Sequence, residues 1–305
     1  MTVTADTDAI KPNLFILGAM KCGTTSLHAY LADHPAIFMS AVKEPTYFLD
    51  RATLREMWPE REESGFWRGE EYYLELFKDA AGYPVRGETG TNYTKLPRVP
   101  DVSRRIADFS PDARFIYIMR DPIKRTISHY WHDFRRGEEK RDILTAFRQE
   151  PHYREVSHYA MQLKPYLDLF GRDRVKALTL EALNADPEAA LSGLFEWLGV
   201  DPAYVPPSLS TRKHVTPQKL RVARGSGALE RFRRSGLWDR VGPKVPRWLR
   251  KTGRRLSQRE VDREAVSTAQ AVEYLRPLQR PEADALAKLL GRNFDEWTTL
   301  YGPGS

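Results

Sequence analysis

The sequence has few of the residues that build disulfides and metal centres. Cys22 is the single cysteine among 305 residues, so no internal disulfide can form, and this usage fits a reducing compartment. The seven histidines are scattered, and neither HExxH nor CxxC occurs, so we expect no metal site. The chain has no run of 18 apolar residues, and its first 13 residues lack the positively charged and apolar regions of a signal peptide. We therefore expect a cytoplasmic protein without a transmembrane segment.

Acidic residues are scarce in one segment near the C-terminus. Residues 212–259 hold 16 Lys or Arg against two acids, whereas the whole chain carries a net charge of only +7. This predicts a basic appendage of loops and helices on a mildly acidic body. The Gly-rich RVARGSG and scattered prolines predict that it is a mobile lid over a binding crevice. The alternatives are a solvated basic face, or a site for a membrane surface or nucleic acid.

Residues 14–27, LFILGAMKCGTTSL, predict a buried strand, a tight turn and the start of a helix. Gly18 and Gly23 allow backbone N–H groups to approach a ligand closely. The unpaired N–H groups and the dipole of the following helix attract an anion, and Lys21 adds a positive charge. Cys22, within the turn, is expected to pack beneath it. The residues of this predicted phosphate cradle are Lys21, Cys22, Gly23, Thr24, Thr25 and Ser26.

The turn differs from a Walker A loop, in which Lys directly follows the second Gly and precedes Ser or Thr. Here Lys21 precedes Gly23, and no GK[ST] occurs. A nucleotide kinase stays open as an alternative, with FIYIMRD as a Walker-B-like strand and Asp121 as a Mg²⁺ ligand. The missing GK[ST] argues against it.

A second candidate phosphate site lies in RDPIKRTISHY, about 100 residues further on. Arg120 follows a buried strand at 115–119, and Ser128 stands about two turns into the next helix. A phosphate between them would accept paired, charge-assisted hydrogen bonds from the Arg120 guanidinium and one hydrogen bond from the Ser128 hydroxyl. We expect both sites to face one crevice, because ligands of parallel sheets lie beyond the carboxyl ends of the strands.

Strand-like and helix-like segments alternate through most of the chain. Strands are expected at 14–17, in HPAIFMS, in VRGETGTNY, at 115–119 and in RVKALTL, with helices between them. This alternation predicts an α/β fold with a mainly parallel central sheet and helices on both faces. We expect a flexible N-terminus at 1–12 and a single domain at 13–305, which includes the basic appendage and two closing helices at 261–297.

The two motifs, G-x-x-K-x-G-T-T-x-L and R-D-P-x-x-R-x-x-S-x-Y, resemble those of sulfotransferases that use 3′-phosphoadenosine 5′-phosphosulfate (PAPS), and the resemblance covers residues 13–200. It implies a P-loop-type three-layer α/β/α fold and PAPS as co-substrate, with no metal. It also implies that the cradle binds the 5′-phosphate, with Lys21 stabilising the leaving group, and that Arg120 and Ser128 bind the 3′-phosphate. In resembling families a basic loop near the C-terminus covers that phosphate, which makes Lys213, Lys219 and Arg221 candidates.

Two residues are candidates for the base that accepts the acceptor's proton. Glu44, in KEPTYFL, resembles the glutamate of heparan-sulfate-type sulfotransferases, and His132 has the spacing of a functional histidine in their N-sulfotransferase branch. The sequence departs from those enzymes at one position. They have a lysine directly after a later glutamate, whereas here Thr89 follows Glu88. This puts a glycosaminoglycan acceptor in doubt and leaves small molecules and saccharides open. Lys43, Lys95 or a residue of the basic segment are possible substitutes.

Overall fold

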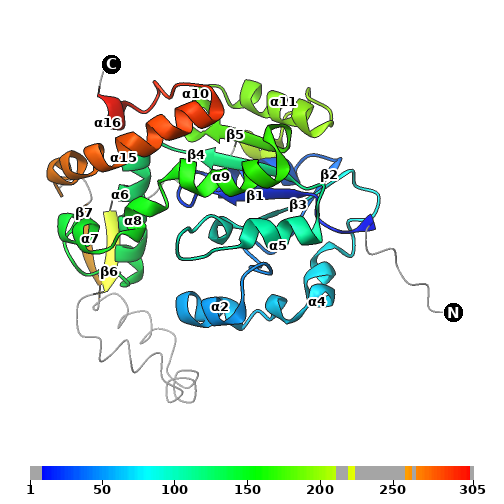
Figure 1. Ribbon diagram of the computed structural model, residues 1–305, viewed down its shortest axis with the longest axis horizontal. Helices are drawn as coiled ribbons and strands as arrows, with labels where there is room; N and C mark the ends of the chain where they lie inside the picture. The colour runs from blue at the N-terminus through cyan, green and yellow to red at the C-terminus, as the bar shows by residue number, and fades with distance from the viewer. Residues whose placement is uncertain (1–8, 211–218, 224–257, 263–265, 303–305) are drawn as a thin grey trace.

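The computed structural model describes residues 9–210, 219–223, 258–262 and 266–302, and at its centre lies a parallel sheet (Figure 1). The strand order is β2-β3-β1-β4-β5. Leu14 of β1 pairs with Gly87 of β3 on one side and with Arg114 of β4 on the other. The strand bounds are β1 Leu14–Gly18, β2 Ile37–Met39, β3 Val85–Thr89, β4 Arg114–Met119 and β5 Val175–Thr179. All five expected strands are therefore present.

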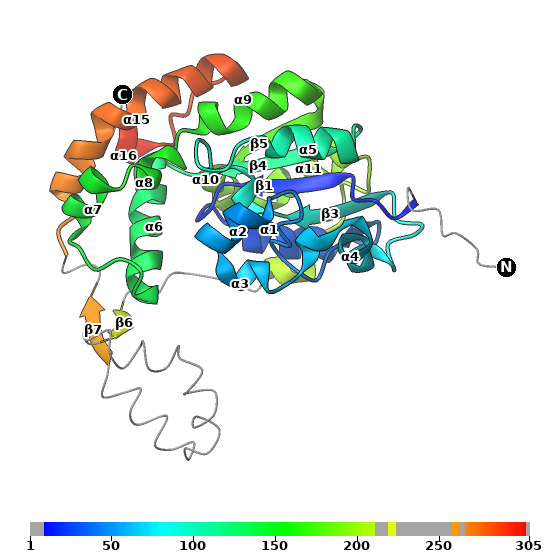
Figure 2. The same cartoon turned by 60° about the horizontal axis from the view of Figure 1, so that its bottom comes forward.

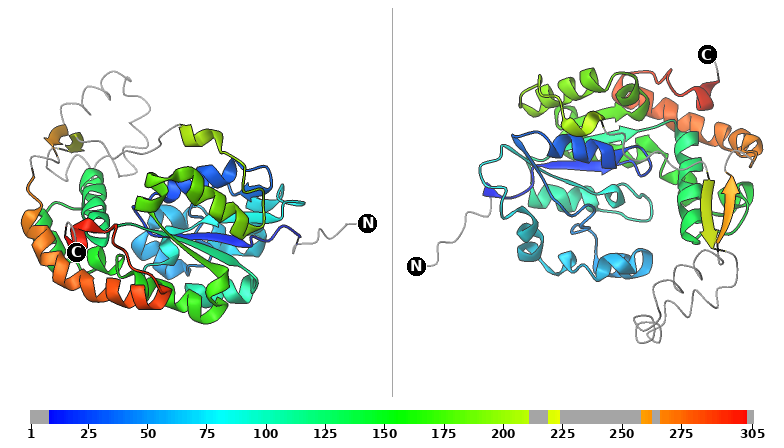
Figure 3. Two further views of the ribbon diagram at one scale, coloured as in Figure 1. Left: turned by 90° about the horizontal axis from the view of Figure 1, so that it is seen from above. Right: turned by 180° about the vertical axis from the view of Figure 1, so that it is seen from behind.

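Helices cover both faces of the sheet, as expected from the continuous apolar runs of its central strands. Every residue of β1 is buried, because strands of a parallel sheet are covered on both sides. Helices α5 (Val102–Phe109) and α9 (Tyr159–Phe170) pack together on one face. Helices α1 (Thr24–Ala32) and α11 (Pro187–Leu198) cover the other (Figure 3). The expected three-layer α/β/α architecture is confirmed.

The other elements surround this core. Residues 143–170 form three separate helices, α7 (Ile143–Gln149), α8 (His152–Glu155) and α9. The two-stranded antiparallel sheet of β6 (Lys219–Ala223) and β7 (Gln258–Asp262) lies beside α6 (Pro122–Arg136), away from the central sheet (Figure 2). Among the described residues, the other α-helices are α2 Arg51–Met57, α3 Pro59–Glu62, α4 Glu70–Leu74, α6 Pro122–Arg136, α7 Ile143–Gln149, α8 His152–Glu155, α10 Leu180–Ala185, α15 Ala269–Leu290 and α16 Thr298–Tyr301.

Both ends of the described chain are held against the core. Within the segment expected to be flexible, the carbonyl of Lys11 accepts from Arg86 Nε at 2.8 Å, and that of Pro12 accepts from Ser110 Oγ at 3.0 Å. The closing tail differs from the expected pair of helices at 261–297, because α15 is one long helix and α16 starts only at Thr298. No helix among the described residues has the length and apolarity to cross a bilayer.

The carboxyl ends of the parallel strands bring the predicted site residues to one edge of the sheet. The cradle follows β1, Glu44 follows β2, and Arg120 follows β4. A further loop, Gly90–Lys95, follows β3 at the same edge. Segments that are far apart in the sequence therefore share one site.

Candidate active site

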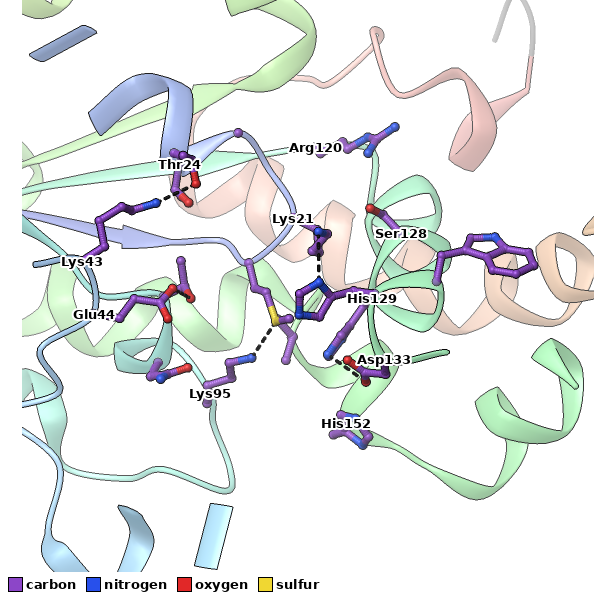
Figure 4. A pocket seen from close by; sticks show the side chains of 18 of the residues that line it. Lys21, Thr24, Lys43, Glu44, Lys95, Arg120, Ser128, His129, Asp133 and His152 are labelled. Atoms are coloured by element: carbon purple, nitrogen blue, oxygen red, sulfur yellow. Dashed lines mark hydrogen bonds and ion pairs between the residues drawn. The ribbon is translucent and has the colours of Figure 1, made fainter. Parts of the chain in front are cut away.

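A cleft of about 2100 Å³ opens at this edge of the sheet. Its wall includes the cradle after β1, the loops after β2 and β3, and one side of α6. Lys21, Glu44, Arg120, Ser128 and His132, predicted from two motifs and two looser matches, all line it. The structure thus brings these five residues to one cleft, and Figure 4 labels Lys21, Glu44, Arg120 and Ser128 among its lining residues.

The turn after β1 has the backbone that a close approach to an anion requires. Gly18 and Gly23 have φ of 145° and 88°, and a Cβ on Gly18 would lie 2.9 Å from Thr94 Oγ1. Lys21 also has a positive φ, 71°, which is uncommon and strained for a residue with a side chain. Gly23, the N-cap residue of α1, has no side chain and therefore does not itself cap the N–H groups of the first turn. These features fit a phosphate cradle.

Cys22 does not line the cleft with its side chain. The thiol is fully buried, with Sγ 3.8 Å from the hydroxyl of Tyr159. Burial raises the pKa of Cys22 to about 12, so the thiol stays protonated and unreactive near neutral pH. Cys22 packs beneath the turn, and its backbone N–H donates to the carbonyl of Ala19 at 3.1 Å.

Lys21 and His132 face each other in the cleft, with Nζ and Nδ1 3.5 Å apart. Burial and the nearby Arg135 lower the pKa of Lys21. Burial and the Lys21 ammonium lower the pKa of His132 to about 4. The imidazole is therefore neutral at pH 7 and accepts a hydrogen bond from Lys21. A histidine with so low a pKa is a weak base near neutral pH.

The carboxylate of Glu44 is held on both oxygens. Thr91 Oγ1 donates to Oε1 at 2.7 Å, and Arg61 Nη2 donates to Oε2 at 3.0 Å. The backbone N–H of Glu44 donates to the carbonyl of Thr89 at 2.7 Å, which fixes the loop to β3. Next to it, Lys43 Nζ donates to Thr25 Oγ1 at 2.6 Å. Lys43 thus reaches the predicted cradle, a contact that sequence reasoning did not assign.

Arg120 and Ser128 lie at the other end of the cleft from Glu44 (Figure 4). The hydroxyl of Tyr159 donates to the carbonyl of Arg120 at 2.7 Å and fixes the end of β4. Ser128 is 5% exposed, on the side of α6 that lines the cleft. Arg125, between them in sequence, is fully buried and donates to Ser157 Oγ at 2.5 Å and to the carbonyl of Tyr153. It supports α6 from behind.

Asp121, the Mg²⁺ ligand of the alternative kinase interpretation, is buried and fully hydrogen-bonded. Its Oδ1 accepts from the N–H groups of Ile123 and Lys124 at the start of α6, and its Oδ2 accepts from those of Thr299 and Leu300. These four bonds satisfy the lone pairs of the carboxylate. Asp121 caps helices instead of facing the cleft.

The cleft also holds a group that the sequence did not reveal. His129, Asp133 and His152 have side-chain atoms within 4.8 Å of one another, as no other such trio among the described residues does. However, Arg125 donates to His129 Nδ1 at 3.2 Å, and burial, followed by nearby positive charges, lowers the pKa values of both histidines. These surroundings disfavour a bound cation. The spacing of His129 and Asp133, one helical turn apart, was the available signal.

The position after Glu88, where the resembling enzymes have a lysine, does not face the cleft. Thr89 is fully buried, with Oγ1 2.9 Å from His28 Nδ1. Both substitutes named from the sequence, Lys43 and Lys95, do line the cleft. Of the remaining predicted residues, Lys213 and the side chains of Lys219 and Arg221 lie outside the described part of the chain, as does most of the basic segment.

Comparison with known proteins gives one consistent result. The profile of the sulfotransferase family matches residues 12–204. A bifunctional heparan sulfate N-deacetylase/N-sulfotransferase 2 from Bos taurus is 25% identical over 210 residues, which cover 63% of this chain and 22% of the relative. The chain therefore spans about a fifth of the length of that relative.

Two further matches agree with it. The heparan sulfate glucosamine 3-O-sulfotransferase 3B1 of Mus musculus is 24% identical over 202 residues, 62% of this chain and 46% of that protein. The crystal structure of a sulfotransferase from Alicyclobacillus acidocaldarius is similar with a TM-score of 0.67 and 26% identity. This similarity covers 94% of this chain and 98% of the bacterial one.

Proposed function

The chain belongs to the sulfotransferase family, and from this premise we propose that it transfers a sulfuryl group from PAPS to a hydroxyl or amine of a small-molecule or saccharide acceptor. The observation that carries the proposal is the shared cleft, in which Lys21 and the first residues of α1 line one part of the wall and Arg120 and Ser128 line another. PAPS carries phosphates at its 5′ and 3′ positions. The saccharide alternative draws on the relatives named for heparan sulfate.

In this reaction the bond between sulfur and the 5′-phosphate oxygen breaks as a bond to the acceptor oxygen or nitrogen forms. The acceptor loses one proton, and adenosine 3′,5′-bisphosphate leaves. Lys21 and the N–H groups of α1 stabilise the charge that develops on the leaving phosphate. Arg120 and Ser128 hold the 3′-phosphate and align the donor. No metal is required when these groups carry the charge.

Glu44 is the proposed base. It lines the cleft as a held carboxylate, whereas His132 has too low a pKa to take a proton efficiently near pH 7. His132 instead orients the Lys21 ammonium through its Nδ1. Both roles belong to the proposal.

Calorimetry in EDTA tests the donor. We expect adenosine 3′,5′-bisphosphate to bind without metal, and ATP with Mg²⁺ to bind far more weakly in a parallel titration. Mass spectrometry of incubations with PAPS and candidate acceptors then searches for an added SO₃. Clear binding of ATP-Mg²⁺ without any heat from the bisphosphate would contradict the proposal.

A further inference from the structure

Lys95 is a buried lysine with almost no partner. It follows β3 and the short helix Thr91–Tyr93, lines the cleft, and is only 9% exposed. Its Nζ donates to Met20 Sδ at 3.1 Å, and thioether sulfur is a weak acceptor. Within the described part of the chain, no carboxylate lies within ion-pair distance of it. A buried charge without a partner is costly, so such a site is expected to bind an anion.

The two carboxylates whose charges act on Lys95, Glu44 and Asp133, are each hydrogen-bonded to other residues. Glu44 is bound by Thr91 and Arg61, and Asp133 Oδ2 accepts from the hydroxyl of Tyr153 at 3.0 Å. Burial, and then the charge of Arg125, lower the pKa of Lys95 to about 8, although both acids oppose this shift. The charged and titratable groups around Lys95 are Glu44, Arg98, Arg125, His129, His132, Asp133 and His152.

The position of Lys95 indicates which anion it would meet. Its Nζ contacts Met20, the residue that directly precedes Lys21 in the cradle. Figure 4 shows Lys95 and Glu44 on the side of Lys21 that is opposite to Arg120 and Ser128. A donor held at its 3′-phosphate by Arg120 and at its 5′-phosphate by Lys21 extends its sulfuryl group beyond Lys21. That group therefore points toward Lys95.

We propose, on the basis of the proposed function, that Lys95 binds the sulfuryl oxygens of the donor and stabilises them during transfer. The negative charge of the sulfuryl oxygens would then neutralise the Lys95 ammonium, which has no carboxylate partner among the described residues. The contact is made to the group that is transferred and not to either phosphate. With water as acceptor, the sulfur–oxygen bond to the 5′-phosphate breaks and one to water forms. Sulfate, two protons and adenosine 3′,5′-bisphosphate leave, so this slow reaction reports on Lys95 without a known acceptor.

The test compares two ligands that differ only by the sulfuryl group. In Lys95→Met, which keeps the side-chain volume, we expect the affinity for adenosine 3′,5′-bisphosphate to stay within twofold of the wild type. Affinity for PAPS, measured by calorimetry in the cold, should fall tenfold or more, and the rate of PAPS hydrolysis should fall at least as much. Lys164→Met is the matched control, because Lys164 is exposed on α9 and forms an ion pair with Asp168.

Thermal stability separates this role from a structural one. Removing a poorly paired buried ammonium should leave the melting temperature of ligand-free Lys95→Met unchanged or higher. A variant that melts lower and loses affinity for both ligands alike would make Lys95 structural and overturn the inference. Unchanged PAPS affinity and hydrolysis would also overturn it, while the wild-type activity would keep the proposed function. A wild type that binds neither ligand would instead contradict the proposed function itself.

A pH series adds an independent reading. Lys95 is charged below its pKa, so the wild-type preference for PAPS over the bisphosphate should decline as pH rises through about 8. In Lys95→Arg the guanidinium stays charged, and the preference should remain flat to pH 9.5. The same decline in both proteins would assign it to another group and overturn the inference.

Discussion

The carboxylate of Asp121 accepts the backbone N–H of Thr299 at 2.8 Å, and this bond joins the end of β4 to the last helix of the described chain. The adjoining Arg120 is one of the proposed phosphate ligands. Trp297, just before α16, is fully buried, and its ring packs on Tyr159 with centroids 5.7 Å apart. Tyr159 in turn fixes the carbonyl of Arg120. The C-terminal tail therefore supports the predicted 3′-phosphate site from behind.

Asp121→Asn should weaken both the fold and this site. An asparagine presents an NH₂ group to one of the two pairs of backbone N–H donors, so that pair loses its acceptor. We expect the free energy of unfolding to fall by about 3 kcal/mol in urea denaturation, with weaker bisphosphate binding. Asp112→Asn is the control, because that side chain is 86% exposed, and it should change stability by less than about 0.5 kcal/mol. Equal effects of both substitutions would contradict this account.

Arg120→Ala should weaken binding of adenosine 3′,5′-bisphosphate by about 2 kcal/mol, roughly 30-fold, because a charge-assisted contact with phosphate is lost. Titration calorimetry in EDTA measures the change. Arg104→Ala, on the exposed side of α5, is the control and should leave affinity unchanged. If Arg120→Ala binds the bisphosphate as tightly as the wild type, the 3′-phosphate lies elsewhere.

The sequence predicted the framework well because its signals are local. The apolar runs at 14–17 and 115–119 form buried strands, and the glycine-bracketed turn occurs where expected. The two motifs then met in one cleft, because both follow parallel strands that sit side by side in the sheet. The apolar strand patterns, and the tendency of ligands to lie beyond the carboxyl ends of parallel strands, were sufficient to predict this part of the site.

What the sequence could not predict depends on tertiary packing. Lys43 and Lys95 follow β2 and β3, and their positions in the cleft depend on a strand order that no local pattern specifies. The low pKa of His132 results from burial and from Lys21, which is 111 residues away in the chain. Likewise, α15 continues through Pro277 and Pro281, which local propensity would place at helix ends.

The identity of the base can be decided by two substitutions. Glu44→Gln keeps the shape and the bond from Thr91 but removes the proton acceptor, so kcat should fall by about 10² or more. His132→Ala should lower kcat less, because it only disturbs the position of Lys21. In the wild type, the plot of kcat against pH should show no titration of His132 between pH 5.5 and 8, because the pKa of His132 is about 4. Bisphosphate affinity serves as the control for folding of Glu44→Gln. Near-normal turnover in Glu44→Gln with loss in His132→Ala would transfer the role to His132.

Glu88 links stability to pH, because its carboxyl is fully buried in β3. Burial raises the pKa of Glu88 to about 8, and the hydroxyls of Tyr73 and Tyr93, which lie nearby without full hydrogen-bond geometry, offset this only in part. In the unfolded chain a glutamate has a pKa of about 4.3. The folded protein therefore retains a proton that the unfolded chain releases, so this group makes folding less favourable as pH rises from about 4.5 to 8.

Glu88→Gln, which is neutral at every pH, should remove this dependence. At pH 8 we expect the variant to exceed the wild type in free energy of unfolding by on the order of 4 kcal/mol, and at pH 4.5 the difference should nearly vanish. Urea denaturation across this range measures both values. Glu75→Gln is the control, since that carboxylate is exposed and forms an ion pair with Lys78, and it should leave the pH dependence unchanged. A Glu88→Gln variant whose stability declines with pH as steeply as that of the wild type would show that Glu88 is ionised in the folded protein.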